Sequence, residues 1–421
     1  MRNFKKTVLI LLVALMSASV FAVDFDFENP AYTSLNTPFT RTSARMNAMG
    51  GAGLAIFTNQ DSLYINPASL GGKGLVFNTP SFSLTLYNIK NGYVDSGILD
   101  TIIEDPSAVS DQDFLMNNVV NGVIGMLSTA GRNKLATVDA GVGFKFGRFA
   151  FALDSQVNLN TYLPVGSGTT DIQIVPQVDI AATLGLGLRF MRDKAINFDV
   201  GISAQLNIRA FLNAVGFDTV MSAMNESGDI MSAFDSMPIA IGWALPLAVG
   251  VNVNFPFGFT ISNVVSNINL INGGYNYVVQ DSYNDFVDDP VDSILSPLQN
   301  DPVFTAKSDA IWSIGFGWHP EYSLDWLAKP TVAVDVVDLV GLFGDFSMTN
   351  FLARLKLGAE LELLNFIELR AGLNGGYTSV GVGFNILIFH VEASYYWNEF
   401  GNVLGEKDVD ALTLRFNLLW E

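Results

Sequence analysis

Residues 178–190, VDIAATLGLGLRF, decide the fold of this chain. Apolar residues from Val178 to Phe190 occupy every second position, and small, polar or charged residues lie between them. Side chains alternate across a β-strand, so the stretch predicts a strand with one apolar face and one polar or small face. The same alternation resumes over residues 196–211 after a short turn, which predicts a long antiparallel hairpin.

Segments with this period recur along the chain, and they are long. Many reach the roughly 9–11 residues that a membrane-spanning strand needs, whereas strands of soluble domains average about five or six. The gaps after odd-numbered segments are mostly long and those after even-numbered segments mostly short, as in barrels with external loops and periplasmic turns. We predict an all-β fold, a transmembrane antiparallel β-barrel of about 14 strands. The segments are 75–89, 136–146, 149–162, 177–190, 196–211, 245–255, 258–268, 309–318, 330–340, 351–363, 366–375, 378–388, 389–397 and 410–420.

Composition and charge narrow the class of protein. Charged residues make up 15% of the 421 residues, against about 25% in average proteins, and the mean hydropathy is +0.33. No stretch beyond the N-terminus approaches the roughly 20 apolar residues of a membrane-spanning helix. A soluble protein with a very large core and a membrane barrel are the two options, and strand length favours the barrel. The net charge of −19 excludes nucleic-acid binding through phosphate neutralisation, and the absence of cysteine excludes disulfides.

The N-terminus predicts export. Arg2, Lys5 and Lys6 precede an apolar run over 8–15, and small residues precede a cleavage point after Ala22, which is the pattern of a secretory signal peptide. An uncleaved anchor is the alternative, but the apolar run is short for a spanning helix. We therefore expect the protein in the outer membrane of a double-membraned bacterium. The expected division is a signal peptide at 1–22, a periplasmic or hatch segment at 23–74 and the transmembrane barrel at 75–421.

A second stretch, MNAMGGAGLAIFTNQDSLYINPASL at 46–70, comes before the first predicted strand. The bore of a barrel of about 14 strands is too wide for wall side chains to fill, so it holds water or a plug. Gly50, Gly51 and Gly53 permit tight turns and close packing, and Pro67 stops any preceding helix, as a compact plug requires. A nucleotide-binding loop is excluded because the third glycine and the Walker lysine are missing. A loosely ordered periplasmic tail is the alternative to the plug.

Two parts of this region, SARMNAMGGAGLA and DSLYINPASL, resemble the N-terminal signature of FadL-type outer-membrane transporters for long-chain fatty acids and other hydrophobic compounds, and of the related PorV-type proteins. The resemblance implies a barrel of the same size, closed by an N-terminal hatch with an Asn-Pro-Ala motif. The expected hatch residues are Met49, Gly50, Gly51, Gly53, Asn66, Pro67 and Ala68. FadL-type barrels release ligand sideways through a kink in the third strand, but residues 149–162 contain no glycine or proline to mark one.

The long gap 212–244 predicts a helical hairpin outside the membrane, because its apolar residues recur at helical spacing on both sides of NESGD. Methionine side chains give such a surface an adaptable apolar character, suited to flexible ligands. FadL-type proteins are similar in having helical external loops that capture ligand. A lid that merely packs on its neighbours is the alternative. The candidate ligand-binding residues are Phe217, Val220, Met221, Met224, Ile230, Met231 and Phe234.

The predicted inner face of the barrel also carries charged residues, and pairing between them is the expected arrangement. The cations are Lys145, Arg189, Arg209, Arg354, Lys356, Arg370 and Arg415. The carboxylates are Asp139, Asp179, Asp199, Glu360, Glu362 and Glu368. A solvated acidic surface is the preferred interpretation of loop 281–301, and a divalent-ion site is the alternative.

The remaining patterns concern chemistry and partners. The chain has two histidines and no cysteine, and it shows neither a nucleophile elbow nor a zinc-binding pair, so we expect no enzyme, catalytic residue, metal or cofactor. The aromatic-ended segment 412–420 predicts recognition by the outer-membrane barrel assembly machinery through Phe416 and Trp420. The other expected partners are membrane lipids and a hydrophobic small-molecule ligand. Candidates for interfacial aromatic girdles are Trp312, Phe316, Trp318, Tyr396 and Trp397.

The function expected from these patterns is passive outer-membrane transport of hydrophobic compounds such as long-chain fatty acids through a hatch-plugged barrel. Two alternatives stay open at this point. One is a PorV-like outer-membrane platform for secreted or surface proteins, and the other is a surface adhesin acting through the long loops.

Overall fold

A computed structural model describes residues 25–420 apart from 33, 57–60, 72–74, 95–99, 102–103, 106–121, 123, 128–129, 169–170, 228–236, 281–297, 299–300, 321–326 and 402. Among the described residues, no helix is long and apolar enough to cross a membrane.

The strands form one antiparallel sheet that closes on itself. The first five are long: β1 (Leu75–Tyr87), β2 (Gly131–Phe146), β3 (Phe149–Leu163), β4 (Gln173–Phe190) and β5 (Asn197–Leu212). Three further strands are each interrupted once: β7 (Ile239–Ala244) with β8 (Pro246–Asn254), β9 (Phe259–Asn269) with β10 (Gly274–Gln280), and β11 (Phe304–Lys307) with β12 (Ile311–Trp318). The last six are β13 (Ala328–Val336), β14 (Leu355–Leu363), β15 (Ile367–Asn374), β16 (Tyr377–Ile386), β17 (Phe389–Glu399) and β18 (Asp408–Trp420).

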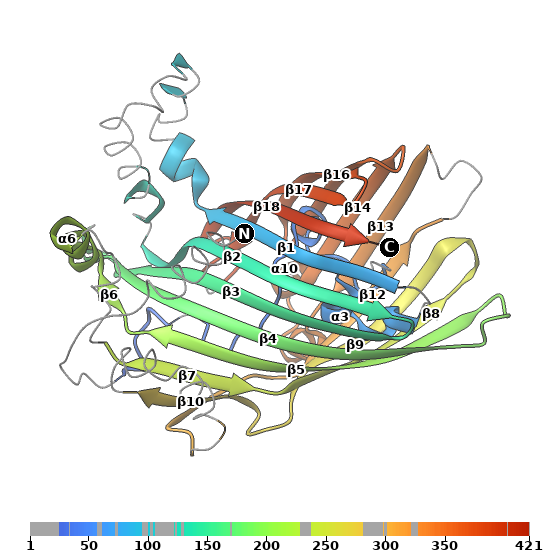
Figure 1. The fold of residues 1–421 in the computed structure, drawn as a ribbon, viewed down its shortest axis with the longest axis horizontal. Helices are drawn as coiled ribbons and strands as arrows, with labels where there is room; N and C mark the ends of the chain where they lie inside the picture. Colours follow the sequence, from blue (N-terminus) through green and yellow to red (C-terminus); the bar gives the residue numbers. More distant parts are fainter. Residues whose placement is uncertain are drawn as a thin grey trace.

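Each strand pairs with its neighbours in sequence, and β18 pairs with β1 to close the ring, for example at Phe82 opposite Phe416. A short segment, β6 (Val215–Gly216), extends the wall beside β4. The result is a closed barrel of 14 antiparallel strands, as the sequence predicts. We call the end with long connections the loop end and the end with short connections the turn end. Figure 1 shows α6 (Phe217–Ser227) at the loop end, opposite the β4–β5 turn.

The wall has exposed apolar side chains on its outer face and buried polar side chains on its inner face, the reverse of a soluble protein. On β4, Leu184 and Leu186 are 49% and 44% exposed, whereas their neighbours Ala181 and Thr183 are buried. The same alternation places carboxylates, amides and arginines inside, and Asp199 on β5 has no exposed surface. An apolar outer face around a polar interior is the organisation of a membrane barrel.

The wall is uneven in height. β2 to β5 have 15 to 18 residues each, but β13, β14 and β15 have only nine, nine and eight. At the loop end of these short strands lie two helices, α9 (Leu339–Gly344) and α10 (Met348–Arg354). The strand predicted to start at 351 therefore starts four residues later, because Ser347 caps α10 by accepting a hydrogen bond from the amide of Asn350.

Two side chains lie elsewhere than predicted. Arg354 ends α10 instead of lying in a strand, and it forms an ion pair of 3.0 Å with Asp338. Tyr396 points inward and is buried, while its neighbours Tyr395 and Trp397 contact each other edge-on at 4.7 Å. A one-residue offset in a strand moves a side chain to the other face.

The third strand is unbroken. β3 pairs with β4 at every position from Phe149 to Tyr162, and the one irregularity on its other side lies in β2 at Leu135. The sequence expectation of a third strand without a kink is confirmed, so this wall has no sideways opening at that place.

Candidate functional site

The N-terminal segment, residues 25–71, lies inside the barrel. It contains α2 (Ala44–Ala48), α3 (Ser62–Ile65) and a 3-10 turn, η1 (Pro67–Gly71). It contacts inward-facing residues on strands all round the wall, from Ser81 on β1 to Arg415 on β18. In Figure 1 the segment, in dark blue, lies behind the strands β1–β5. The described residues of the segment therefore occupy the bore.

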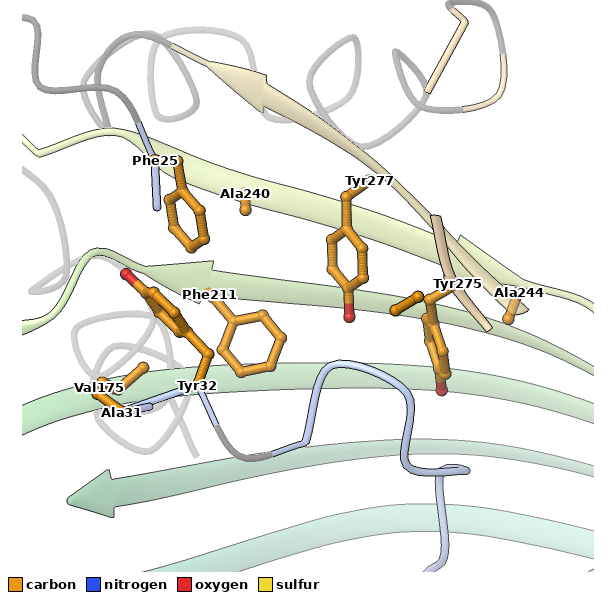
Figure 2. Packing of buried hydrophobic residues seen from close by; sticks show 10 residues of the cluster. Phe25, Ala31, Tyr32, Val175, Phe211, Ala240, Ala244, Tyr275 and Tyr277 are labelled. Carbon is orange, nitrogen blue, oxygen red and sulfur yellow. The ribbon is translucent and has the colours of Figure 1, made fainter. Parts of the chain in front are cut away.

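Aromatic side chains hold the first part of the segment at the loop end. Phe25 and Tyr32 stack with ring centroids 4.6 Å apart, and Tyr32 meets Phe211 of β5 edge-on at 5.8 Å. The hydroxyl of Tyr277 on β10 donates a 2.8 Å hydrogen bond to the carbonyl of Leu35. Figure 2 shows these rings gathered between β4, β5, β7 and β10. Offset and edge-on ring pairs of this kind add roughly 0.5–1.5 kcal/mol each beyond the area that they bury.

Carboxylates hold the middle of the segment. Asp335 on β13 accepts hydrogen bonds from the amides of Gly53, at 2.6 Å, and Leu54, at 3.0 Å, through one oxygen. Glu360 on β14 accepts two 2.7 Å hydrogen bonds from the guanidinium of Arg45. Bidentate and charge-assisted bonds are about twice as strong as neutral ones, so these two strands fix the position of residues 45–54.

A buried asparagine holds the end of the segment. The side-chain amide of Asn66 donates at 2.7 Å to the carbonyl of Leu54 and at 2.7 Å to Asn252 on β8. Its side-chain oxygen accepts a 3.0 Å bond from the amide of Ala68, which fixes the turn through Pro67. Asn66, Pro67 and Ala68 are all buried. One side chain thus joins the two halves of the segment to each other and to the wall.

The wall is shaped to receive this turn. Gly187, Gly201 and Gly250 face one another across β4, β5 and β8, and we call them the glycine row. A Cβ added to Gly201 would lie 2.1 Å from the carbonyl carbon of Pro67, and one added to Gly250 would lie 2.2 Å from the side-chain oxygen of Asn66. Glycine is required at these positions because the backbone of the segment touches the backbone of the wall.

A second set of small residues, which we call the small-residue row, begins on β12, one strand beyond β8 along the wall. Gly317, Ala333, Gly358 and Gly372 are paired in register from β12 to β15. A Cβ on Gly358 would lie 2.7 Å from the carbonyl oxygen of Met49, which is itself fully buried. The segment is therefore seated on two rows of small residues, from β4 to β8 and from β12 to β15.

Two of the expected hatch glycines have the backbone that the sequence suggested. Gly50 and Gly51 have φ of +63° and +75°, a conformation that favours glycine. A Cβ on Gly50 would also lie 2.4 Å from the carbonyl oxygen of Leu373. Gly53 acts instead through its amide, as described above.

Buried charges inside the bore are paired. Arg41 lies 3.4 Å from Asp154 of β3, and Arg415 of β18 lies 3.4 Å from Asp61. The hydroxyl of Ser43 also donates a 2.7 Å bond to Asp61. Burial acts to raise the pKa of the Asp61 carboxyl, but Arg415 and Ser43 lead the opposing effects and hold that pKa below its ordinary value.

The arginines predicted on the inner wall follow the same rule. Arg189 binds Asp199 at 2.6 Å, and Arg209 binds Asp179 at 2.5 Å. Arg370 donates to three carboxylates, Glu360, Glu368 and Glu392. Glu368 and Glu392, with His390, are spaced closely enough to ligate a metal, but their oxygens already accept hydrogen bonds from Arg370. Among the described residues, each inward-facing arginine of the strands has a carboxylate partner.

The candidate capture loop is only partly described. Phe217 and Val220 lie on α6, as the helical spacing predicts, and both pack on apolar residues at the strand ends. Val220 is 7% exposed against Leu212 and Ile239. Met221 and Met224 also lie on α6, while Ile230, Met231 and Phe234 fall outside the described residues. The two described side chains therefore cover the rim of the barrel at the loop end.

The sequence did not single out the wall residues that seat the segment. Asp335 and Asn252 lie in predicted strands but carry no local mark, because only the pairing register brings them to residues 53, 54 and 66. The signal that could have found them is the run of glycines on predicted inner faces, such as Gly185 and Gly187.

Comparisons with known proteins follow this geometry. No protein-family model and no curated protein sequence matches the chain. It is similar to FadL-type outer-membrane proteins of solved structure. A Pseudomonas aeruginosa FadL homologue is 13% identical, with a TM-score of 0.40 over 91% of this chain and 98% of the other. The Pseudomonas putida toluene transporter TodX is 10% identical, with a TM-score of 0.42 over 90% and 97%. Likeness at this level shows no function.

Proposed function

We propose that this protein lets hydrophobic compounds diffuse passively across the outer membrane, through a barrel whose N-terminal segment acts as a hatch. The observation that supports the proposal is the seating of residues 25–71 against small-residue rows and paired charges inside a wall with an apolar outside. A filled bore does not conduct like an open water-filled pore. A filling made of one chain segment can shift without breaking the hydrogen bonds that join one wall strand to the next.

The part of the hatch that moves is the turn η1 at the turn end. Opening requires Asn66 to leave Asn252 and Pro67 to leave the glycine row. Each neutral hydrogen bond contributes about 0.5–1.5 kcal/mol net, so the closed state is favoured without being locked. Residues 25–35 at the loop end would stay in place through their aromatic contacts.

Uncharged hydrocarbons are the first substrates to test, and long-chain fatty acids, which the sequence resemblance suggests, are the second. The arginines of the inner wall are paired with carboxylates, which favours ligands that bring no carboxylate of their own. The external helix α6 and the rest of the 212–244 loop would capture the ligand.

The test is flux into liposomes. Intact protein and a variant lacking residues 46–70 are reconstituted, and entry of a fluorescent fatty acid and of an uncharged aromatic probe is followed. The variant must retain the heat-modifiable gel mobility of a folded barrel. We expect entry above that of empty liposomes with intact protein and faster entry with the variant. Equal rates in both, matching empty liposomes, would remove transport as the function.

The second candidate is a membrane platform for secreted or surface proteins, in which the segment would stay seated and the bore closed. A bore closed permanently by paired charges and backbone contacts serves no flux. Co-purification of a defined partner chain, together with absence of flux in the liposome assay, would support the platform over the transporter.

Insertion into the membrane is proposed to use the last strand. Phe416 on β18 is 38% exposed on the outer face and pairs with Phe82 across the closing seam. The barrel assembly machinery would recognise it together with Trp420. Replacing Phe416 with serine is expected to lower the amount of assembled barrel, measured as the heat-modifiable band, and unchanged assembly would exclude this role.

A further inference from the structure

The helices α9 and α10 expose more apolar surface than their size explains. Four of their residues and one beside them are large, apolar and 40–72% exposed, while Leu339 and Leu342 face inward. We call the exposed residues the rim patch. They are Val340, Phe343, Phe346, Met348 and Leu352. A contiguous exposed apolar surface on a folded protein marks an interaction site.

The height of the wall places the rim patch at the level of a lipid surface. A strand rises about 3.3 Å per residue, so a strand tilted by about 40° climbs roughly 2.5 Å per residue. The nine residues of β13 climb about 23 Å, close to the roughly 25 Å of a barrel's apolar band. The chain turns into α9 within three residues of the end of β13, so the helices begin where the lipid-facing band ends.

The patch is continuous with that band. The ring of Phe343 lies 6.5 Å from the ring of Trp312 on β12, and α9 packs against this strand. Below Trp312 on the same outward face come Ile314 and Phe316, each 39% exposed. The indole of Trp312 donates a 3.0 Å hydrogen bond to Asn263, as a ring with one apolar and one polar edge does at a membrane interface.

The charges of this region lie outside the rim patch. Arg354 and Asp338 neutralise each other in an ion pair of 3.0 Å. Asp345, between the helices, accepts a 2.7 Å hydrogen bond from the side-chain amide of Asn350. The patch itself contains no charged side chain.

We propose that α9 and α10 form an interfacial anchor, in which the rim patch inserts into the lipid leaflet beside the short wall of the barrel. An amphipathic helix lies in the interface with its apolar face about 5–10 Å into the headgroup and acyl boundary. The anchor fixes the height and tilt of the barrel on its low side, where the strands alone barely span the apolar layer. This inference concerns the outer surface and goes beyond the proposed transport, but it rests on the membrane location of the barrel.

The test uses the absence of cysteine from the chain. Single variants Phe346→Cys and Met348→Cys are labelled with a fluorophore and reconstituted in phosphatidylcholine vesicles. Quenching by nitroxide-labelled phosphatidylcholine and by aqueous iodide is then measured. Val165→Cys is the water control, because Val165 is 86% exposed in the loop after the long strand β3. Ile314→Cys is the membrane control on the outer face of β12.

The proposal expects labels at 346 and 348 to be quenched by nitroxide lipid about as strongly as the label at 314, and by iodide several-fold less than the label at 165. Iodide quenching equal to that at 165, with 314 still quenched by lipid, would place the helices in water and overturn the anchor alone. Protection from both quenchers would mean cover by a second protein copy and would also overturn it. Loss of lipid quenching at 314 would overturn the membrane location itself.

Discussion

The replacement Gly201→Ala tests whether the turn η1 opens and closes the bore. The added Cβ would lie 2.1 Å from the carbonyl carbon and oxygen of Pro67 and 2.4 Å from the amide of Ala68. Carbon atoms in contact stand about 3.5–4.0 Å apart, so the turn must retreat by roughly 1.4 Å or more. Overpacking of this kind raises the free energy of the closed state by about 1–3 kcal/mol and leaves that of the open state unchanged. The open fraction should therefore rise roughly 5- to 150-fold.

The assay is entry of an uncharged hydrophobic probe into liposomes, together with single-channel conductance in planar bilayers. Gly201→Ala should raise the rate of entry and the frequency of conducting events. Gly143→Ala is the matched control, since it is an inward-facing strand glycine whose added Cβ would meet its nearest atom at an ordinary 3.5 Å. Circular dichroism and heat-modifiable mobility establish that both variants form the barrel.

One result would refute the reasoning. If Gly201→Ala folds normally and gives the same flux and conductance as Gly143→Ala and the parent protein, then displacing η1 does not open the bore. The hatch would then be a fixed part of the core, and the platform function would gain support.

Three further predictions concern the segment and the loop end. Asn66→Ala should speed amide hydrogen exchange in residues 61–71, since it removes the hydrogen bonds of Asn66 to Asn252, Leu54 and Ala68, each worth about 0.5–1.5 kcal/mol net; unchanged exchange would contradict the role of Asn66. The fold lowers the pKa of the Asp61 carboxyl. The ionised carboxylate therefore stabilises the fold fully above the ordinary carboxyl pKa of about 4, and this stabilisation is lost as the pH falls below that value. Acid should thus make residues 25–71 more susceptible to protease. Asp61→Asn should raise the protease susceptibility of the same residues already at pH 7. Burial lowers the pKa of Lys407 to about 8, so this amine should reach half-maximal methylation near pH 8, and a midpoint near 10 would contradict its burial.

The fold was predictable because its signal is local. Alternation such as that from Val178 to Phe190 predicts both a strand and the face of it that contacts lipid. The lengths of the connections between strands predict at which end of the barrel each connection lies. The wrong predictions lie at positions where alternation alone does not decide the local structure. Ser347 starts a helix where apolar alternation suggested a strand, and Tyr396 sits one residue from the face assigned to it.

Of the candidate site, the sequence predicts the N-terminal segment but not the wall residues that contact it. The glycines of residues 46–70 predict a compact element, and the Asn-Pro-Ala motif draws attention to Asn66. The wall that receives it could not be predicted, because Gly201 and Asn252 reach Pro67 and Asn66 only through the register of strands far apart in sequence. Register depends on pairing geometry, which no single stretch of sequence carries.

The partners of the N-terminal segment have a consequence for biogenesis. Asp335, Glu360 and Arg415 come from β13, β14 and β18, late in the chain, while the segment that they hold precedes β1. The seam between β1 and β18 closes the wall around it. If the seam formed first, residues 25–71 would have to enter the bore through one end of the finished barrel, past the wall residues that later hold them. We therefore expect seam closure and seating of the segment to be coupled during folding.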